Sequence, residues 1–355
     1  MKIDLIAASM HGGGAQRVIV LLATHFASVG HEVAVITFTE EDAFYIDNRI
    51  TKVKLLSKKF NNHTLNALNN LRVHYKKASS RPDVLISFVQ KMNFSSIIIS
   101  KLYGIKVIAC EHSNHLRRKN VTTAFTWNYL YQFADAVTVL TEFDKLFFER
   151  KGAKVAVMPN PSTFSRIKND SIPKKKVILA VGNLDRYHIK GFDNLLELIS
   201  PVLKQFPDWH LKLVGGGNSG LGVLKALAIN HGIADQVVFT GFRTDVNILM
   251  QESEIFVLSS RFEGLPMVLL EAMSQGIACI SYNCITGPSE IIKHQENGLL
   301  IEDQNKGAMK NGLIQLIEEP LLRKQLSKNA LQSLDRFSID NIYRKWEKLF
   351  AEITH

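Results

Sequence analysis

Short apolar runs rich in Val and Ile alternate with longer amphipathic segments along the whole chain. Apolar runs bounded by turn residues predict buried strands of parallel sheets, and the longer segments between them predict crossover helices such as residues 15–29. The expected strands are residues 3–8, 33–38, 84–88, 107–110, 136–140, 155–158, 177–181, 211–214, 237–240, 255–258 and 278–281. This alternation predicts an α/β fold with two doubly wound, Rossmann-like parallel sheets.

The chain is long enough for two domains. Its 355 residues exceed the roughly 250 to 300 residues at which a single hydrophobic core usually splits. Prolines at positions 159 and 161, followed by a polar and basic stretch up to residues 173–176, predict a hinge. We therefore expect one domain at residues 1–165 and another at 166–338, with ligands in the cleft between them at the C-terminal strand ends. The last segment, 339–353, has an apolar helical face that must pack against a domain.

Composition excludes several classes of protein. Apolar residues at 46% and charged residues at 21% are ordinary for a globular protein and argue against disorder. The three cysteines, Cys110, Cys279 and Cys284, lack metal-ligand spacing and are too few for a disulfide framework, which fits a reducing cytosol. Neither a signal peptide nor an apolar run near the ~20 residues of a spanning helix is evident in the sequence. We expect a cytoplasmic protein that is soluble or peripheral to the membrane.

Positive charge is concentrated in the first half of the chain. Residues 1–165 contain 21 Lys and Arg against 12 Asp and Glu, a net charge of +9, whereas the remainder has 22 against 21, or +1. The basic clusters are Lys52, Lys54, Lys58 and Lys59; Arg72, Lys76, Lys77 and Arg81; Arg117, Arg118 and Lys119; and Lys145, Arg150, Lys151 and Lys154. Such a surface suits an anionic membrane or a lipid phosphate, and a plainly solvated face is the alternative. Nucleic acid is disfavoured because no nucleic-acid-binding motif accompanies the charge.

The stretch Glu263-Gly-Leu-Pro-Met-Val-Leu-Leu-Glu271 is the most informative motif. It follows the expected strand 255–258, and Pro266 suits the first position of a helix. Amides at a helix start would hold a diphosphate, and the two flanking carboxylates are good acceptors for sugar hydroxyls. The motif therefore predicts a nucleotide-sugar site. Solvated acidic residues on a surface helix are the alternative interpretation.

Two glycine-rich segments are candidate phosphate-binding sites, and we favour only the first. His11-Gly12-Gly13-Gly14 follows the first strand and opens the first helix, where glycine lets backbone amides approach a phosphate; a tight turn without a ligand is the alternative. Residues 215–220 match G-x-G-x-x-G and suggest a dinucleotide-dependent oxidoreductase. We disfavour that function because Asp235, near the required spacing, precedes the next strand instead of ending it.

A basic loop and a histidine complete the candidate residues. Arg186 and Lys190 lie in the segment 182–191 after the strand 177–181, where they could neutralise a departing diphosphate in place of a metal ion. His112 follows the strand 107–110 and could hydrogen-bond a sugar or steady positive charge near the reacting carbon. Surface cations and a structural histidine are the respective alternatives.

Taken together, the glycine turn, His112, the loop with Arg186 and Lys190, and the Glu263–Glu271 motif resemble a retaining glycosyltransferase of the GT-B fold, family 4. The resemblance implies that Glu271 binds the ribose, Glu263 the donor sugar, and the amides around Leu265 and Pro266 the phosphates. Asn183 stands where the family usually has an arginine, and whether Arg186 takes that role is open. The expected catalytic residues are Glu263, His112, Lys190 and Arg186. The expected nucleotide-sugar ligands are Gly13, Gly14, Gly182, Arg186, Lys190, Gly241, Phe242, Glu263, Gly264, Leu265, Pro266 and Glu271.

The resemblance also implies a reaction and partners. Residues 339–355 would form a helix that crosses back to the first, acceptor-binding domain, and the second domain would bind the donor. Gly287-Pro288-Ser289-Glu290 resembles a subset of bacterial enzymes that build lipopolysaccharide, O-antigen, capsule or exopolysaccharide. We expect transfer of a hexose or N-acetylhexosamine from a nucleotide sugar, with UDP favoured, to a saccharide or polyprenyl-diphosphate-linked acceptor, without metal or cofactor. An NAD-linked oxidoreductase or a non-catalytic sugar-nucleotide-binding partner are the alternatives.

Overall fold

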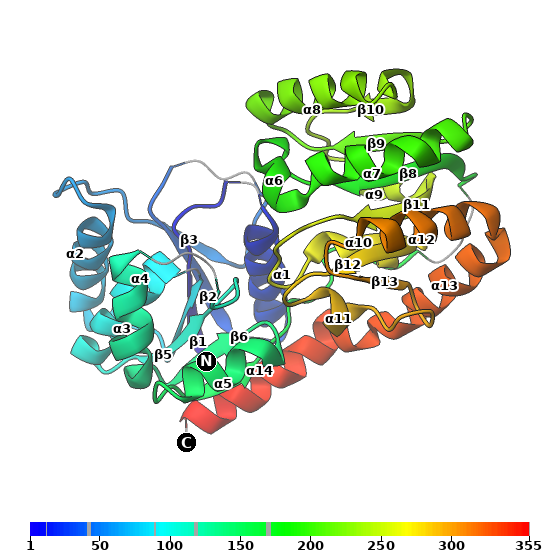
Figure 1. Cartoon of the computed structure of the whole chain (residues 1–355). Helices are drawn as coiled ribbons and strands as arrows, with labels where there is room; N and C mark the ends of the chain where they lie inside the picture. Colours follow the sequence, from blue (N-terminus) through cyan, green and yellow to red (C-terminus); the bar gives the residue numbers. More distant parts are fainter. Residues whose placement is uncertain (12, 41–43, 89, 117–119, 168–171, 355) are drawn as a thin grey trace. The chain divides into compact units, whose positions relative to one another are not determined.

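The computed structural model describes the chain except for residues 12, 41–43, 89, 117–119, 168–171 and 355. The basic cluster Arg117, Arg118 and Lys119 lies outside the described residues. Two compact units are present: unit 1 comprises Met1–Pro161 and Phe337–His355, and unit 2 comprises Ser162–Arg336. The chain thus passes from one unit to the other at Pro161, inside the expected hinge, and returns after Arg336 (Figure 1). In the described part of the chain, no helix has the length and apolar character to cross a bilayer.

Unit 1 is built on a parallel sheet of seven strands in the order β3-β2-β1-β4-β5-β6-β7. Its strands are β1 (Lys2–Ile6), β2 (Glu32–Thr37), β3 (Thr51–Lys54), β4 (Val84–Phe88), β5 (Lys106–Cys110), β6 (Ala136–Val139) and β7 (Val155–Val157). Its helices are α1 (Gly14–Ser28), α2 (His63–Lys76), α3 (Gln90–Tyr103), α4 (Val121–Phe125), α5 (Glu142–Glu149) and α14 (Ile339–Thr354). A π-helical turn (Thr126–Leu130) and a 3₁₀ turn (Tyr131–Phe133) continue α4.

Unit 2 has a parallel sheet of six strands in the order β10-β9-β8-β11-β12-β13. Its strands are β8 (Lys175–Val181), β9 (His210–Val214), β10 (Val237–Phe239), β11 (Ser253–Leu258), β12 (Ala278–Asn283) and β13 (Leu299–Glu302). Its helices are α6 (Tyr187–Lys190), α7 (Phe192–Gln205), α8 (Asn218–Asn230), α9 (Val246–Gln251), α10 (Met267–Ser274), α11 (Pro288–Ile291), α12 (Lys306–Glu318) and α13 (Pro320–Ser333). A 3₁₀ turn (Leu184–Arg186) precedes α6.

The structure confirms two doubly wound parallel sheets, with two strands that the apolar pattern missed. Both missed strands, β3 and β13, lie at the edge of their sheets. β3 contains Lys52 and Lys54 and is largely exposed, because an edge strand is paired on one side only and does not need a continuous apolar run. The central strands β1, β4 and β5 are almost wholly buried, which is why their apolar runs were recognisable.

The C-terminal helix α14 belongs to unit 1 and packs against α1 (Figure 1). Trp346 and Phe350 of α14 lie against Phe26 of α1, with ring centroids 6.0 Å and 5.6 Å from that of Phe26. All three side chains are buried. His31 Nε2 also lies 3.2 Å from the hydroxyl of Tyr343. The apolar face expected in this segment is therefore part of the core of unit 1.

Replacing Trp346 by Ala should lower the free energy of unfolding by about 3–5 kcal/mol, because a large buried ring is removed from a filled core. Urea unfolding monitored by far-UV circular dichroism measures the effect, because this signal does not depend on tryptophan fluorescence. Lys348→Ala on the exposed face of the same helix is the matched control and should change stability by less than about 0.5 kcal/mol. Equal effects of the two substitutions would contradict the assignment of α14 to the core.

Candidate functional site

The candidate residues of unit 2 follow the C-terminal ends of parallel strands in one sheet. Gly182 follows β8, Gly241 follows β10 and Glu263 follows β11. Parallel strands end at one edge of the sheet, so the loops behind them are brought together. Backbone hydrogen bonds join these loops: the amide of Gly182 donates to the carbonyl of Val214 at 2.9 Å, and that of Gly215 to the carbonyl of Gly241 at 3.0 Å. Phe242, next to Gly241, is exposed.

An ion pair joins two of the expected catalytic residues. Lys190 Nζ donates to Glu263 Oε1 at 2.7 Å, and the two side chains are only 18% and 11% exposed. Ser260 Oγ donates to the same oxygen at 2.7 Å. The site therefore holds a cation and a carboxylate that are largely shielded from solvent and balance each other's charge.

Glycine makes this pairing sterically possible. Gly191, directly after Lys190, has φ +66°, and a Cβ placed on it would lie 1.9 Å from the carbonyl oxygen of Ser259. The hydroxyl of Ser259 donates to the carbonyl of Lys190 at 2.9 Å. The α6 segment and the loop after β11 are thus in direct backbone contact, at a conformation and distance that other residues would not tolerate.

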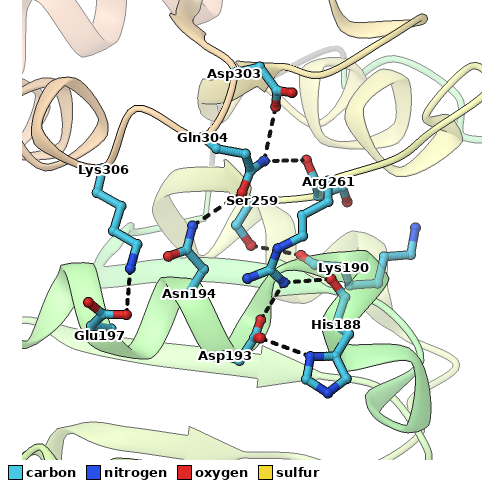
Figure 2. Close-up of polar contacts among 11 residues, drawn as sticks. His188, Lys190, Asp193, Asn194, Glu197, Ser259, Arg261, Asp303, Gln304 and Lys306 are labelled. Atoms are coloured by element: carbon cyan, nitrogen blue, oxygen red, sulfur yellow. Dashed lines mark hydrogen bonds and ion pairs between the residues drawn. The ribbon is translucent and has the colours of Figure 1, made fainter.

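A polar network that the sequence gave no sign of holds these loops (Figure 2). Arg261 Nη1 donates to the carbonyl of His188 and to Asp193 Oδ1, both at 2.6 Å. Asp193 Oδ2 lies 3.0 Å from His188 Nδ1, and Asn194 donates to Gln304 Oε1 at 3.3 Å. The network connects the starts of α6 and α7 to the loops after β11 and β13. It therefore fixes the backbone of α6, which carries Lys190.

Arg186 is not part of this cluster in the structure. Its side chain is exposed, and it has no hydrogen bond or ion pair among the described residues. The segment expected as a basic loop contains a 3₁₀ turn at Leu184–Arg186 and the short helix α6. Asn183 starts this turn by accepting a hydrogen bond from the amide of Asp185 at 2.9 Å. The helical turns place Lys190, and not Arg186, beside Glu263.

Pro266 is the N-cap of α10, and its expected place as the first helical residue was wrong by one position. Its ψ of 95° is extended, and its carbonyl accepts from the amide of Leu269 at 3.0 Å, so the helix begins at Met267. The turn at Gly287 packs against this start, because a Cβ there would lie 2.4 Å from the carbonyl oxygen of Gly264. The amides of Met267 and Val268 come too early in α10 to have an intrahelical acceptor, so they can bind an anion.

Glu271 is buried in α10 and accepts a hydrogen bond from a hydroxyl. The donor is Thr163 Oγ1, at the start of unit 2, and only 7% of Glu271 is exposed. Leu265, two residues after Glu263, is buried as well. A carboxylate held in a buried position and oriented toward a hydroxyl has the chemistry expected of a ribose ligand.

The G-x-G-x-x-G segment has a packing role. A Cβ on Gly215 would lie 1.8 Å from the carbonyl oxygen of Gly182, and one on Gly220 would lie 1.8 Å from that of Leu184. Asp185 Oδ1 accepts from Ser219 Oγ at 2.6 Å and from the amide of Gly220 at 2.9 Å. The start of α8 is thus covered by the protein's own carboxylate, which leaves no reason to place a pyrophosphate there.

In unit 1, the glycine turn and His112 also lie after strands. Gly13 is the N-cap of α1, which begins at Gly14, so the glycines lie at a helix N-terminus as expected. His112 follows β5, and its ring centroid lies 5.3 Å from that of Phe88. Both ring nitrogens are shielded from solvent and have no hydrogen-bond partner among the described residues. Burial lowers the pKa of His112 to about 4, so the ring is neutral at pH 7.

The depressed pKa makes a prediction for acid stability. The unfolded chain binds a proton at His112 below about pH 6.5, whereas the folded protein does so only below about 4, so acidification through this window favours unfolding. Between pH 7 and pH 4, the free energy of unfolding of the wild type should fall by at most about 3 kcal/mol more than that of His112→Asn. Urea unfolding at several pH values measures this difference. His231→Asn in unit 2 is the control, and a wild-type loss that His112→Asn fails to reduce would contradict the assignment.

Comparison with known proteins gives consistent similarities along the chain. The family model described as Glycosyl transferases group 1 matches residues 162–333, and the one described as Glycosyltransferase Family 4 matches residues 12–163. A Campylobacter jejuni GalNAc-α-(1→4)-GalNAc-α-(1→3)-diNAcBac-PP-undecaprenol α-1,4-N-acetyl-D-galactosaminyltransferase is 31% identical over 99% of both chains. The amylovoran biosynthesis glycosyltransferase AmsD of Erwinia amylovora is 28% identical over 97% of this chain and 98% of its own. The Anabaena HepE structure in complex with UDP is similar in fold, with a TM-score of 0.81, 17% identity, and coverage of 99% of this chain and 100% of that one.

Proposed function

This chain belongs to the family 4 glycosyltransferases and has the GT-B fold, and we propose that it transfers a hexose or N-acetylhexosamine from a UDP sugar with retention of anomeric configuration. The acceptor is a saccharide or a polyprenyl-diphosphate-linked saccharide in the synthesis of a bacterial surface polysaccharide. The names of the Campylobacter and Erwinia relatives support this acceptor class, and the UDP complex of HepE supports the donor. The observation that carries the proposal is the shielded Lys190–Glu263 pair after β11.

The pair provides what a nucleotide sugar needs. On donor binding, Lys190 would exchange Glu263 for the diphosphate, and Glu263 would accept hydroxyls of the donor sugar. Glu271 would accept the ribose hydroxyls, as it accepts that of Thr163 in the structure. The amides around Leu265 and Pro266, together with Gly182, Gly241 and Phe242, would line the rest of the donor, and Gly13 and Gly14 would contact the diphosphate. Arg186 is exposed, and its side chain has no partner within the described part of the chain, so it is free to join the diphosphate as a second cation.

The proposed reaction needs no strong protein base. The C1–O bond to the diphosphate breaks, and its electron pair stays on the phosphate oxygen, where Lys190 stabilises the charge. The acceptor hydroxyl forms the new bond to C1 on the same face and gives its proton to that phosphate oxygen. His112, being neutral, would hydrogen-bond the sugar as the positive charge develops. Positioning and charge stabilisation then supply most of the rate, and we propose that no metal is required.

Nucleotide binding is the first test. UDP at ~100 times its dissociation constant should stabilise the wild type by roughly 2.7 kcal/mol in a thermal-shift assay, and Glu271→Ala should abolish the shift. Glu318→Ala, an exposed carboxylate on α12, should keep it. GDP, ADP and NAD complete the panel. A shift with NAD alone would contradict the proposal, and binding without any transfer would identify a non-catalytic partner instead. The anomeric configuration of the product, read by NMR, decides between retention and inversion.

We also propose that the basic surface of unit 1 holds the enzyme at the cytoplasmic face of an anionic membrane. Each Lys near such a surface contributes about 1 kcal/mol, so Lys58→Ser/Lys59→Ser should weaken co-sedimentation with phosphatidylglycerol vesicles roughly thirtyfold. Both lysines are exposed. Lys324→Ser/Lys328→Ser, exposed on α13 of unit 2, is the matched control and should bind as the wild type. Equal binding to neutral vesicles, or binding insensitive to salt, would contradict an electrostatic anchor.

A further inference from the structure

Glu111, the residue before His112, is a buried carboxylate that the proposed reaction does not use. It follows β5, and only 2% of it is exposed. Its amide donates to the carbonyl of Thr138 at 2.8 Å, which fixes the backbone beside β6. A buried carboxylate is retained at such a position only when hydrogen bonds compensate its desolvation.

Three side chains donate to this carboxylate. Trp127 Nε1 donates to Oε1 at 2.9 Å, the hydroxyl of Tyr131 donates to the same oxygen, and Gln90 Nε2 donates to Oε2 at 3.0 Å. Asn93 Nδ2 donates to the hydroxyl of Tyr131 at 2.9 Å, so the tyrosine proton is directed at Glu111. Burial raises the pKa of Glu111 to about 7, and the hydrogen bonds from Tyr131, Trp127 and Gln90 oppose this rise because they favour the ionised form, which only accepts.

Two of the three donors, Trp127 and Tyr131, come from a helical wall formed by residues 121–133, and the third, Gln90, is at the start of α3. The π-helical turn Thr126–Leu130 within this wall turns Trp127 and Tyr131 inward, and both are fully buried. The opposite face of the wall presents Val121, Phe125 and Tyr129 to solvent. Glu111 is therefore the point at which this wall is attached to the segment carrying His112.

The segment is attached at its other end as well. His115 donates its backbone amide to Asp144 Oδ1 at 2.8 Å, and its Nδ1 lies 2.7 Å from the same oxygen. The His115 ring is stacked on Phe147, with centroids 4.2 Å apart. His112 thus lies in a short span between two buried carboxylates. Its own ring has no hydrogen-bond partner among the described residues, so these attachments take the place of a direct one.

We propose that Glu111 is a positioning residue that fixes the orientation of His112 and attaches the 121–133 wall to it. This inference rests on the proposed role of His112 at the donor sugar. Glu111 itself touches neither substrate, and it acts by holding the imidazole where the sugar is to arrive. A misplacement of a positioned group by about 1 Å can lower a rate about a hundredfold.

The chain offers a matched control for a merely structural role. Asp4 in β1 is also a buried carboxylate in unit 1, and it accepts from the hydroxyl of a buried tyrosine, Tyr75, at 2.7 Å. Glu111→Gln and Asp4→Asn make the same chemical change, the replacement of a buried carboxyl group by an amide at nearly constant volume. Tyr131→Phe removes one donor from Glu111 and leaves the carboxylate in place.

Two measurements on the full-length protein test the proposal. Glu111→Gln should lower kcat for sugar transfer by about tenfold or more. The KM for the nucleotide sugar should stay within about twofold of the wild type, because Glu263 and Glu271, which are proposed to bind it, are unchanged. Tyr131→Phe should have a smaller effect in the same direction, and Asp4→Asn should keep the wild-type kcat. In NMR spectra, the ring signals of His112 should shift in Glu111→Gln and stay in place in Asp4→Asn.

Each outcome decides the proposal. Unchanged His112 ring signals in Glu111→Gln, or equal losses of kcat in Glu111→Gln and Asp4→Asn, would overturn it. The NMR measurement does not depend on turnover, so a wild-type protein without transferase activity would refute the proposed function while the positioning of His112 is still decided. A rise in the KM for the nucleotide sugar in Glu111→Gln, in proportion to the loss of kcat, would also overturn the proposal, because it would assign Glu111 to binding of the nucleotide sugar.

Discussion

Close backbone contact between the loops that follow parallel strands is the constraint on which the rest of unit 2 depends. Gly191 lies against the carbonyl of Ser259, and Gly215 against that of Gly182, at distances that a Cβ would not permit. These contacts let loops distant in sequence share one edge of the sheet. The ion pair of Lys190 and Glu263, the Arg261 network behind it and the helix start at Met267 all follow from that approach.

The sequence was sufficient to predict the central strands of both sheets and the strand–loop–helix unit that contains Glu263 and Glu271. Buried central strands leave continuous apolar runs, and the Glu263–Glu271 spacing is confined to one strand–loop–helix unit, so both are local signals. The edge strand β3 is rich in lysine and has no continuous apolar run by which it could be recognised. The exact helix start after Pro266 was also beyond reach, because it depends on which carbonyl accepts the first amide.

Contacts across long stretches of chain were not predictable in the same way. Arg261 and Asp193 are 68 residues apart, and nothing in either neighbourhood marks the other as a partner. Glu111 resembles any glutamate in the sequence, and only the fold shows that Trp127, Tyr131 and Gln90 surround it. By contrast, the position of Asp235 ahead of its strand is a local signal against a dinucleotide site at residues 215–220, and the contact of Asp185 with the start of α8 agrees with it.

The discontinuity of unit 1 has a consequence for the order in which the protein matures on the ribosome. The apolar face of α1 is complete only when Trp346 and Phe350 cover Phe26, and these residues follow the whole of unit 2 in the sequence. Unit 2 is continuous and can fold as soon as residue 336 has emerged, since domains generally fold as units during synthesis. Unit 1 therefore reaches its native core only after unit 2 has been translated, and until then nascent unit 1 presents an uncovered aromatic surface to chaperones.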